Sequence, residues 1–395
     1  MKNYVIISEF NPFHKGHQYL IEQCRKHGAT HITAVMSGNF VQRGDVAIVS
    51  KHSRVKMALK GGVDLVLELP LPYALSNAQN FARGGVQIAD SMGCCDCLVF
   101  GSECGDTTIL KQIADSMQNT KFHLFLKKEM QKGISYPNAV ANTMKNFDSQ
   151  YADILNMPNN VLAIEYIKAL NEYHSIIIPV TFRRIGDDHN SSQIYSEVAS
   201  ASNIRNLILK HCDFRNFVPE TSYDILRRCI RNGKIANMDN NMRAILYRLR
   251  NMSIEELSKI TDIHEGLEYK IKKAIQQSVT FDEIIKNAKS KRYTYAGLRR
   301  ILISAFLGIT HFFSNQGVPY LRILGFNANG TEILKQMKNK ATLPIVTKIT
   351  NLPDIFSDFA RAMLNLEIQS TDIYATFMQN IMPCGMEFIN GIVID

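Results

Sequence analysis

Two histidines, His14 and His17, stand three residues apart near the N-terminus, with Gly16 between them. Residues at this spacing share one face at the start of a helix, where backbone N–H groups are unpaired, and glycine lets a phosphate approach the backbone. Nucleotidyl transfer needs mainly positioning and neutralisation of the charge that develops on the α-phosphate and the leaving pyrophosphate. The spacing therefore predicts a nucleotide site in which His14 and His17 are the catalytic residues.

The plainer alternative is a pair of ordinary surface histidines near a turn. The context disfavours it, because a short β-rich apolar run precedes the pair and an apolar helical pattern follows it. A zinc site is disfavoured as well, since no third and fourth ligands follow at a metal-site spacing. The cysteines Cys94, Cys95 and Cys97 lack the C-x-x-C spacing, so we expect no metal held by the protein.

A second motif, Ser200-Ala201-Ser202-Asn203-Ile204-Arg205, opens a helical pattern far downstream. Hydroxyls and an arginine at a helix N-terminus suit the β- and γ-phosphates of a triphosphate. The alternative is a plain helix cap by Ser200 or Ser202. Together with the histidine motif, the segment favours phosphate binding by Ser202 and Arg205.

Alternating strand and helix patterns must position these motifs. Such alternation predicts an α/β fold: a Rossmann-like, doubly wound parallel sheet with ligands at the carboxyl ends of its strands. The loops after Ser8, Met36 and Phe100 should meet at that edge. We expect strands at 4–8, 31–36, 64–69, 97–100 and 176–182, and helices at 51–60, at 77–91 and from 200 onward.

Helical periodicity dominates after about residue 206. We therefore expect two domains, a catalytic ATP-binding domain at 1–205 and a mainly α-helical, basic domain at 206–395. A strand, a turn at Asn329-Gly330 and a helix over 321–337, with an apolar run at 343–346, predict a small α/β element inside the second domain.

The formal net charge of +9 and the pI near 9.0 favour an anionic partner, and basic residues concentrate after about residue 200. No apolar run approaches the ~20 residues that span a bilayer, and the N-terminus does not look like a signal peptide. We expect a cytoplasmic protein with reduced thiols and no membrane association.

The segments SEFNPFHKGH, SGNFVQRGD, GGVDLVLELP, VFGSECGD, PNNVLAIEYIKAL and SASNIR, in this order, resemble the bacterial tRNA(Met) cytidine acetate ligase family of the HxGH nucleotidylyltransferase superfamily. The resemblance implies that ATP activates acetate as acetyl-AMP, and that the acetyl group passes to N4 of the wobble cytidine of elongator tRNA(Met). ATP is then a substrate, accompanied by Mg²⁺, and no obligate protein partner is evident.

The same resemblance implies an ATP site. For two of its residues, the neighbour in the sequence is an alternative assignment: Asn160 for Asn159, and Arg183 for Arg184. The family has a glycine-tyrosine-histidine stretch where this chain has Gly186-Asp187-Asp188-His189, so the register at His189 is open. The implied ATP-binding residues are Ile7, Ser8, Glu9, Phe10, Asn11, Pro12, Phe13, His14, Lys15, Gly16, His17, Gln18, Tyr19, Leu20, Gly101, Asn159 and Arg184.

A basic segment that contains aromatic residues follows position 288 and suits RNA, because such a mixture binds phosphates and stacks unpaired bases. Its plainer alternative is a solvated helix face with two core tyrosines, and the family resemblance favours RNA. The tRNA-binding candidates are Lys291, Arg292, Tyr295, Arg299 and Arg300.

Acetate offers one methyl group, so we expect a tight acyl pocket between loops 8–17 and 37–43, with Phe10 and Phe40 in its walls. Arg43 is either a ligand for acetate or a tRNA phosphate, or a solvated surface residue. The alternative function is a cofactor-forming adenylyltransferase that joins ATP to a small phosphorylated precursor. A third hypothesis is a non-catalytic RNA-binding protein with a relict nucleotide site.

Overall fold

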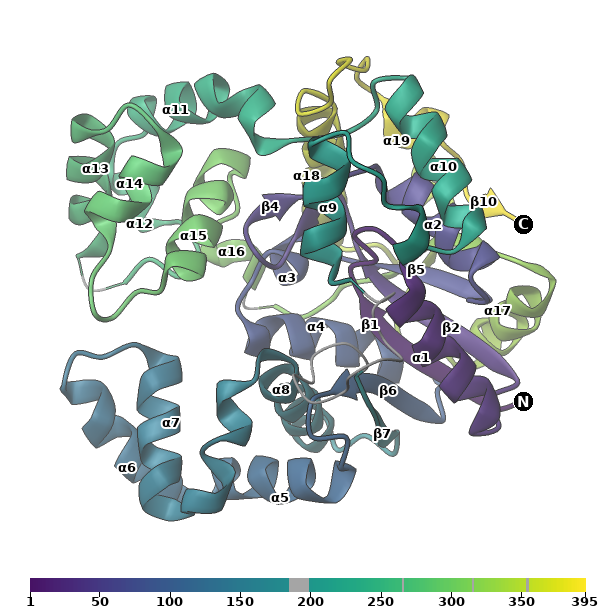
Figure 1. Cartoon of the computed structure of the whole chain (residues 1–395), viewed down its shortest axis with the longest axis horizontal. Coiled ribbons are helices and arrows are strands. Elements are labelled where there is room, and N and C mark those ends of the chain that lie inside the picture. Colours follow the sequence, from purple (N-terminus) through teal and green to yellow (C-terminus); the bar gives the residue numbers. More distant parts are fainter. Residues whose placement is uncertain (185–198, 265, 315, 353–354) are drawn as a thin grey trace.

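A mostly parallel, eight-stranded sheet runs through the centre of the molecule (Figure 1). The computed structural model describes residues 1–184, 199–264, 266–314, 316–352 and 355–395. The strand order is β10-β8-β5-β2-β1-β6-β7, with β9 paired to β8. The strands are β1 (Asn3–Ser8), β2 (His31–Ser37), β5 (Leu65–Leu69), β6 (Cys97–Ser102), β7 (Ile178–Arg183), β8 (Leu321–Phe326), β9 (Ile345–Val346) and β10 (Val393–Ile394).

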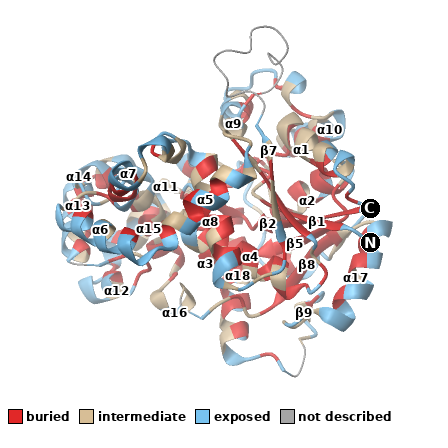
Figure 2. Cartoon of the chain, turned by 90° about the horizontal axis from the view of Figure 1, so that it is seen from below, coloured by how far each residue is buried: buried red, intermediate tan, exposed pale blue. Residues whose placement is uncertain are grey.

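Both faces of the sheet are covered by helices, as its continuous apolar strands require. Successive residues of β1 alternate between two cores, Tyr4 and Ile6 in one and Val5 and Ile7 in the other. One core includes helices α1 (Lys15–Lys26), α2 (Lys51–Lys60), α9 (Ala201–Leu209) and α10 (Glu220–Arg231). The other includes α4 (Ala78–Ser91), α5 (Thr107–Gln118), α8 (Pro158–Glu172), α17 (Ala328–Lys340) and α18 (Asp358–Ala375). Figure 2 shows the buried residues concentrated in the sheet and the helices against it.

The chain reverses its direction of travel across the sheet at β1. From β1 it continues through β2 and β5 to one side, and it then returns to place β6 and β7 on the other side of β1. Ligands of doubly wound sheets bind at this reversal, beyond the carboxyl ends of the strands. The expected α/β doubly wound class is confirmed, and the loops after β1 and β6 lie at the reversal.

The C-terminal segment completes this sheet, which corrects the expected division of the chain. β8 pairs antiparallel with β5, and β10 pairs parallel with β8. The small α/β element expected within a separate 206–395 domain is therefore part of the catalytic sheet. The expected turn at Asn329-Gly330 is also wrong: α17 begins at Ala328, and the Asn327 side chain caps it by accepting from the Gly330 N–H.

Buried ion pairs fix the C-terminal segment to the sheet. Lys51 Nζ lies 2.5 Å from Glu68 Oε1 and 2.5 Å from Glu387 Oε1. Arg322 Nη1 lies 3.0 Å from Glu68 Oε2, and Arg322 also pairs with Glu387. Glu387 belongs to α19 (Met386–Ile389). Since buried charges destabilise a fold unless they are paired, the strand residue Glu68 depends on partners from the last part of the chain.

Two helical lobes extend from the sheet on the left of Figure 1. The sequence did not predict the first, which lies between β6 and β7 and contains α6 (Thr120–Gln131) and α7 (Tyr136–Phe147). The second has a core of its own that also contains Phe40 and Leu71 of the sheet region. Its helices are α11 (Met242–Asn251), α12 (Ile254–Ser258), α13 (Leu267–Gln277), α14 (Phe281–Ala288), α15 (Tyr295–Leu307) and α16 (His311–Ser314). In the described parts of the chain, no helix combines the length and apolar character needed to cross a bilayer.

Candidate active site

The two motif histidines form a rigid pair at the start of α1. The His14 side chain caps the helix, with Nδ1 accepting from the Gly16 N–H at 3.0 Å. His17 Nδ1 in turn accepts from the His14 N–H at 3.2 Å, and the two rings stack with centroids 3.8 Å apart. Because each Nδ1 accepts a hydrogen bond, the proton of each neutral ring is on Nε2. Both rings therefore offer an Nε2–H donor.

Burial keeps both imidazoles neutral. It lowers the pKa of His14 to about 3, and the nearby guanidinium groups of Arg184 and Arg205 add to the effect. Burial also lowers the pKa of His17 well below its ordinary value, with contributions from His14 and Arg184. At neutral pH the pair acts on a phosphate as hydrogen-bond donors, while the arginines supply the positive charge.

A buried arginine that the sequence analysis missed holds the loop after β1. Arg54 of α2 is fully buried and donates to the carbonyls of Glu9 at 2.7 Å, Ser37 at 3.0 Å and Val49 at 3.2 Å. It thereby joins the carboxyl ends of β1 and β2. The only sequence signal was a charged residue on the apolar face of the helix pattern at 51–60.

The downstream serine motif lies at the same cavity as the histidine motif. Ser200 is the N-cap of α9, and its side chain accepts from the Asn203 N–H at 3.2 Å. Arg205 Nη1 donates to the Asn11 carbonyl at 2.9 Å. Ser202 and Arg205 line the same cavity as His14 and His17.

The structure separates the two alternatives that the sequence left open for the ATP site. Asn159 and Arg184 line the cavity, whereas Asn160 and Arg183 do not. The amide oxygen of Asn160 is instead engaged by the backbone N–H groups of Glu103 and Cys104. The segment with the open register, residues 186–189, lies outside the described residues.

Gly101 also lines the cavity, where it sits against Arg184. A Cβ added to Gly101 would lie 3.0 Å from Arg184 Cγ. Of the 7–20 segment, Phe13 belongs to the core below the site and packs on Gly61. The cavity-lining members of the 7–20 segment are Ile7, Ser8, Glu9, Phe10, Asn11, His14, His17 and Leu20.

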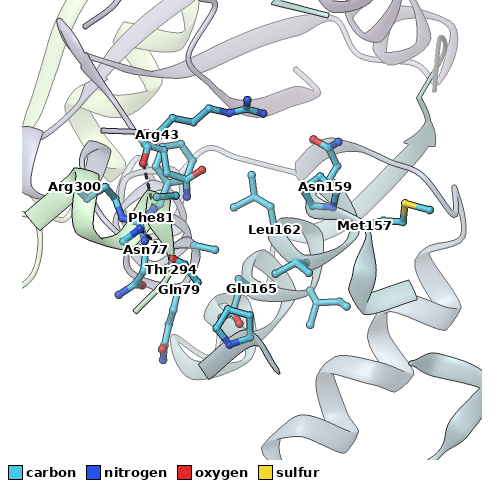
Figure 3. Close-up of a pocket in the computed structure, with 18 of the residues that line it drawn as sticks. Arg43, Asn77, Gln79, Phe81, Met157, Asn159, Leu162, Glu165, Thr294 and Arg300 are labelled. Carbon is cyan, nitrogen blue, oxygen red and sulfur yellow. Dashed lines mark hydrogen bonds between the residues drawn. The ribbon is translucent and has the colours of Figure 1, made fainter. Parts of the chain in front are cut away.

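The cavity has a volume of about 1490 Å³ and reaches from the sheet edge to both helical lobes. Figure 3 shows Arg43 and Arg300 on one wall and Asn159 on the opposite wall. Pockets for a single small ligand usually measure roughly 300–1,000 Å³, so this cavity has room for ATP and part of a second substrate. The first lobe contributes Lys127, Met130, Gln131, Ile134, Tyr136, Pro137 and Val140, and the second contributes Asp262, His264, Arg292, Tyr293, Thr294, Ala296, Gly297, Arg300 and Ile301.

The five tRNA-binding candidates fall into two groups. Arg292 and Arg300 line the cavity, while Lys291, Tyr295 and Arg299 do not. Arg299 Nε donates to the Gly44 carbonyl at 3.1 Å, and its guanidinium lies 3.5 Å from Asp45 in the hairpin of β3 (Phe40–Val41) and β4 (Asp45–Val46). Arg299 thus fixes the second lobe to the sheet region.

The two aromatic residues expected in the acyl pocket, Phe10 and Phe40, lie in different surroundings. Phe10 lines the cavity, and so does Arg43 of the neighbouring loop. Phe40 is fully buried and packs edge-on against Tyr374 and Phe377. The expectation for Phe40 is wrong, because the core of the second lobe extends under the hairpin and takes up this ring.

Potential metal ligands do not gather in the described residues: nowhere do three His, Cys, Asp or Glu side chains come together. All eight cysteines are unpaired.

The fold and the site are those of a nucleotidyl transfer enzyme, and the HIGH Nucleotidyl Transferase family model matches residues 1–386. Within that class, the chain belongs to the tRNA(Met) cytidine acetate ligase family. It is 37% identical to the protein of that name from Acetivibrio thermocellus, over 100% of both chains. It is 38% identical to the one from Thermoanaerobacter sp. strain X514, over 98% of each.

Solved structures agree with this assignment. The crystal structure of apo Thermotoga maritima TmcAL matches with a TM-score of 0.93 and 31% identity, covering 100% of this chain and 99% of that one. The TmcAL structure with bound alpha-thio ATP matches with a TM-score of 0.92, 31% identity and full coverage of both chains. The family resemblance drawn from the sequence is confirmed.

Proposed function

We propose that this protein is an ATP-dependent ligase that activates acetate as acetyl-AMP and transfers the acetyl group to N4 of the wobble cytidine of elongator tRNA(Met). Its relatives are named tRNA(Met) cytidine acetate ligases, and a similar structure binds an ATP analogue. The observation that carries the proposal is one cavity that joins the histidine motif to the basic wall of the second lobe. Acetate, the elongator tRNA and N4 as the acceptor atom are parts of this proposal.

In the first step, an acetate oxygen attacks the α-phosphorus of ATP and pyrophosphate leaves. We assign the Nε2–H groups of His14 and His17 to the oxygens that gain charge at the α-phosphate. Arg205, Ser202 and Arg184 hold the departing β- and γ-phosphates, in keeping with their place in the cavity. No covalent enzyme intermediate is needed, since the adenylate is itself a good acetyl donor.

The second step requires the RNA base to reach the same cavity. Single-stranded loops are read with bases turned outward, and basic side chains hold the flanking phosphates. Arg292 and Arg300 of the second lobe and Lys127 of the first line the cavity and suit that role. The anticodon loop then enters between the two helical lobes.

We propose that Mg²⁺ accompanies the triphosphate. The polar groups around the histidine motif are chiefly arginines, hydroxyls and backbone N–H groups, which suit an anion, and the described residues offer no ready-made cage for a cation. Phosphate oxygens would then be its main ligands. We also place the enzyme in the cytoplasm, with no obligate protein partner.

The cofactor-forming adenylyltransferase is the weaker candidate. A small phosphorylated precursor does not explain a cavity that extends to two helical lobes. The relatives from Acetivibrio thermocellus and Thermoanaerobacter are named for acetate ligation and not for that activity.

The test incubates the protein with ATP, radiolabelled acetate and total tRNA. We expect label in tRNA, recovered as N4-acetylcytidine after nuclease digestion, and pyrophosphate exchange into ATP that depends on acetate and not on tRNA. Omission of ATP should abolish both signals. Absence of acetate-dependent exchange, or dinucleotide formation from a phosphorylated precursor, would contradict the proposal.

A further inference from the structure

Glu9 is the first residue beyond β1 and lines the cavity at the sheet edge. Its Oε1 accepts from the Gln42 N–H at 2.9 Å, which fixes the carboxyl group. Its other oxygen, Oε2, has neither a hydrogen-bond nor an ion-pair partner among the described residues. A half-buried carboxylate at a substrate cavity therefore keeps one oxygen for a ligand.

The other carboxylates of the cavity wall are engaged elsewhere. Both oxygens of Glu103 accept from Asn159 and Asn160. Both oxygens of Glu165 lie 2.9 Å from Lys168 Nζ. Asp262 belongs to the second lobe and interacts electrostatically with Arg300. Among the described residues of the wall, Glu9 is thus the carboxylate with an available oxygen beside the nucleotide loop.

A buried hydroxyl near Glu9 also lacks a partner. Tyr166 of α8 is 2% exposed, its ring packs on Phe100, and it lines the same cavity. In the described part of the chain, nothing forms a hydrogen bond with its hydroxyl. It interacts electrostatically with Glu9. Leaving a buried polar group unsatisfied costs roughly 1–3 kcal/mol, so a bound ligand that accepts from this hydroxyl would recover that energy.

These two groups match the pairing edge of cytosine. The exocyclic N4 amine is a donor, which aspartate and glutamate accept in nucleic-acid complexes, while N3 and O2 are acceptors. Enzymes that modify a base read it by this edge after turning it out of the stack. A carboxylate oxygen and a tyrosine hydroxyl that line one cavity can present one acceptor and one donor to that edge.

We propose that Glu9 is the general base of the acetyl-transfer step, accepting a proton from N4 of the cytosine, and that the Tyr166 hydroxyl orients the base by donating to its N3 or O2. The inference rests on the proposed function. The N4 lone pair attacks the acetyl carbonyl carbon, the new C–N bond forms, and the bond from that carbon to the phosphate oxygen breaks. AMP leaves with the bonding electrons, and the N4 proton passes to Glu9 Oε2 and then to solvent.

The charge around Glu9 fits this role. Burial of the carboxyl raises its pKa, and the Gln42 N–H with Arg205, Arg43 and Arg54 opposes that rise. A raised pKa makes the carboxylate a stronger base than an ordinary glutamate, while the neighbouring guanidinium groups favour its charged form.

The test separates the two half-reactions. Acetyl-AMP made chemically is supplied to the enzyme with tRNA(Met), and the single-turnover rate of acetyl transfer is measured from pH 5 to 9. For Glu9→Gln we expect a fall of ~10²-fold or more and loss of the rise with pH, in the range typical of a lost general base. Acetate-dependent pyrophosphate exchange should fall by a clearly smaller factor than acetyl transfer, because acetate attacks as a carboxylate and that step removes no proton.

Two further variants guard against a merely structural effect. Glu9→Asp keeps a carboxylate and should retain the pH dependence at a reduced rate, and Tyr166→Phe should raise KM for tRNA with little change in exchange. The matched control is Glu172→Gln, an exposed carboxylate paired with Arg83 outside the cavity, which should behave as wild type.

Three results would overturn the inference: Glu9→Gln transferring acetyl within threefold of wild type, Glu9→Gln keeping the wild-type pH profile, or equal losses in both half-reactions. A failure of the proposed function is distinct, since wild type itself would then show neither acetate-dependent exchange nor transfer.

Discussion

At the scale of single residues, the histidine pair owes its chemistry to burial and to backbone contacts. The ring nitrogens Nδ1 of His14 and His17 are occupied by backbone N–H groups, and burial holds both rings neutral. Neutral hydrogen-bond donors that are already fixed in position stabilise developing charge without reorganising during the reaction. The same burial has a consequence for stability, because a charged imidazole is disfavoured there.

Replacement of His17 tests the chemical role. His17→Ala should lower acetate-dependent pyrophosphate exchange by ~10²-fold or more, the loss typical of a donor to developing charge. His123→Ala, on the exposed side of α6, is the control and should leave exchange unchanged. A folded His17→Ala enzyme with normal exchange would remove His17 from the catalytic assignment.

The lowered pKa of His14 predicts acid sensitivity of the empty enzyme. The folded pKa of about 3 lies below the ordinary value of 6.5, so the unfolded chain binds more protons between these values. Stability therefore falls as pH falls through this window, by on the order of 2 kcal/mol between pH 7 and pH 5 for this one group.

Urea unfolding at pH 7 and pH 5 measures that loss. His14→Asn keeps a good helix cap and removes the imidazole, so its stability should decline less on acidification than that of wild type. His123→Asn should decline as wild type does. An identical decline in His14→Asn would show that this histidine is not the group that titrates.

At the scale of elements, the segment 291–300, which runs into α15, contains tRNA-binding candidates and residues that fix the second lobe. Arg299 is held by Gly44 and Asp45 of the β3–β4 hairpin, and the Tyr295 hydroxyl donates to Asp282 at 2.7 Å. Lys291 and Arg292 are exposed, and Arg292 reaches the cavity. The structure therefore favours Arg292, Arg300 and the exposed Lys291 for RNA phosphates, and gives Arg299 a structural role.

Salt dependence distinguishes these roles. Lys291→Ala with Arg292→Ala should weaken tRNA binding and reduce the slope of log K against log salt by about 0.7–0.9 for each lost phosphate contact. Acetate-dependent exchange should survive. The matched control is Lys335→Ala with Lys338→Ala on α17, which removes two exposed charges at a helix outside both lobes. An unchanged slope in the first variant would make this segment a solvated surface.

At the scale of the whole molecule, the catalytic sheet draws strands from both ends of the chain. β8 covers the edge of β5, and Arg322 and Glu387 satisfy the buried charges of Glu68 and Lys51. We propose a revised division in which residues 242–314 form a helical lobe inserted into one catalytic unit.

A fragment of residues 1–205 should therefore fail to fold as a domain. It would leave β5 as an exposed apolar edge strand. It would also leave the buried charges of Lys51 and Glu68 without their partners Glu387 and Arg322. Circular dichroism and thermal unfolding of the fragment and the full chain would measure this, and we expect a cooperative transition for the full chain alone. A cooperative, native-like transition in the fragment would restore the boundary at 205.

The sequence by itself determined the local features of this protein. Apolar runs predicted β1, β2, β5, β6 and β7 to within a few residues and placed α2 at residues 51–60. The spacing of His14, Gly16 and His17 predicted that both rings stand at a helix start, because such patterns depend on neighbouring residues. The sequence also indicated that Ser202 and Arg205 belong with the histidine motif, since hydroxyls and an arginine at a helix N-terminus suit phosphates.

Only the tertiary structure decided which side chains face the cavity and which strands complete the sheet. Asn159 and Asn160 have the same side chain, and their difference arises from the position of Glu103 across the cavity wall. Phe40 was expected in a pocket wall, yet it packs in the core of the second lobe; Arg54, which no motif singled out, joins two strand ends. Such roles depend on contacts between segments far apart in the chain, as with β5 and β8, and no local periodicity encodes them.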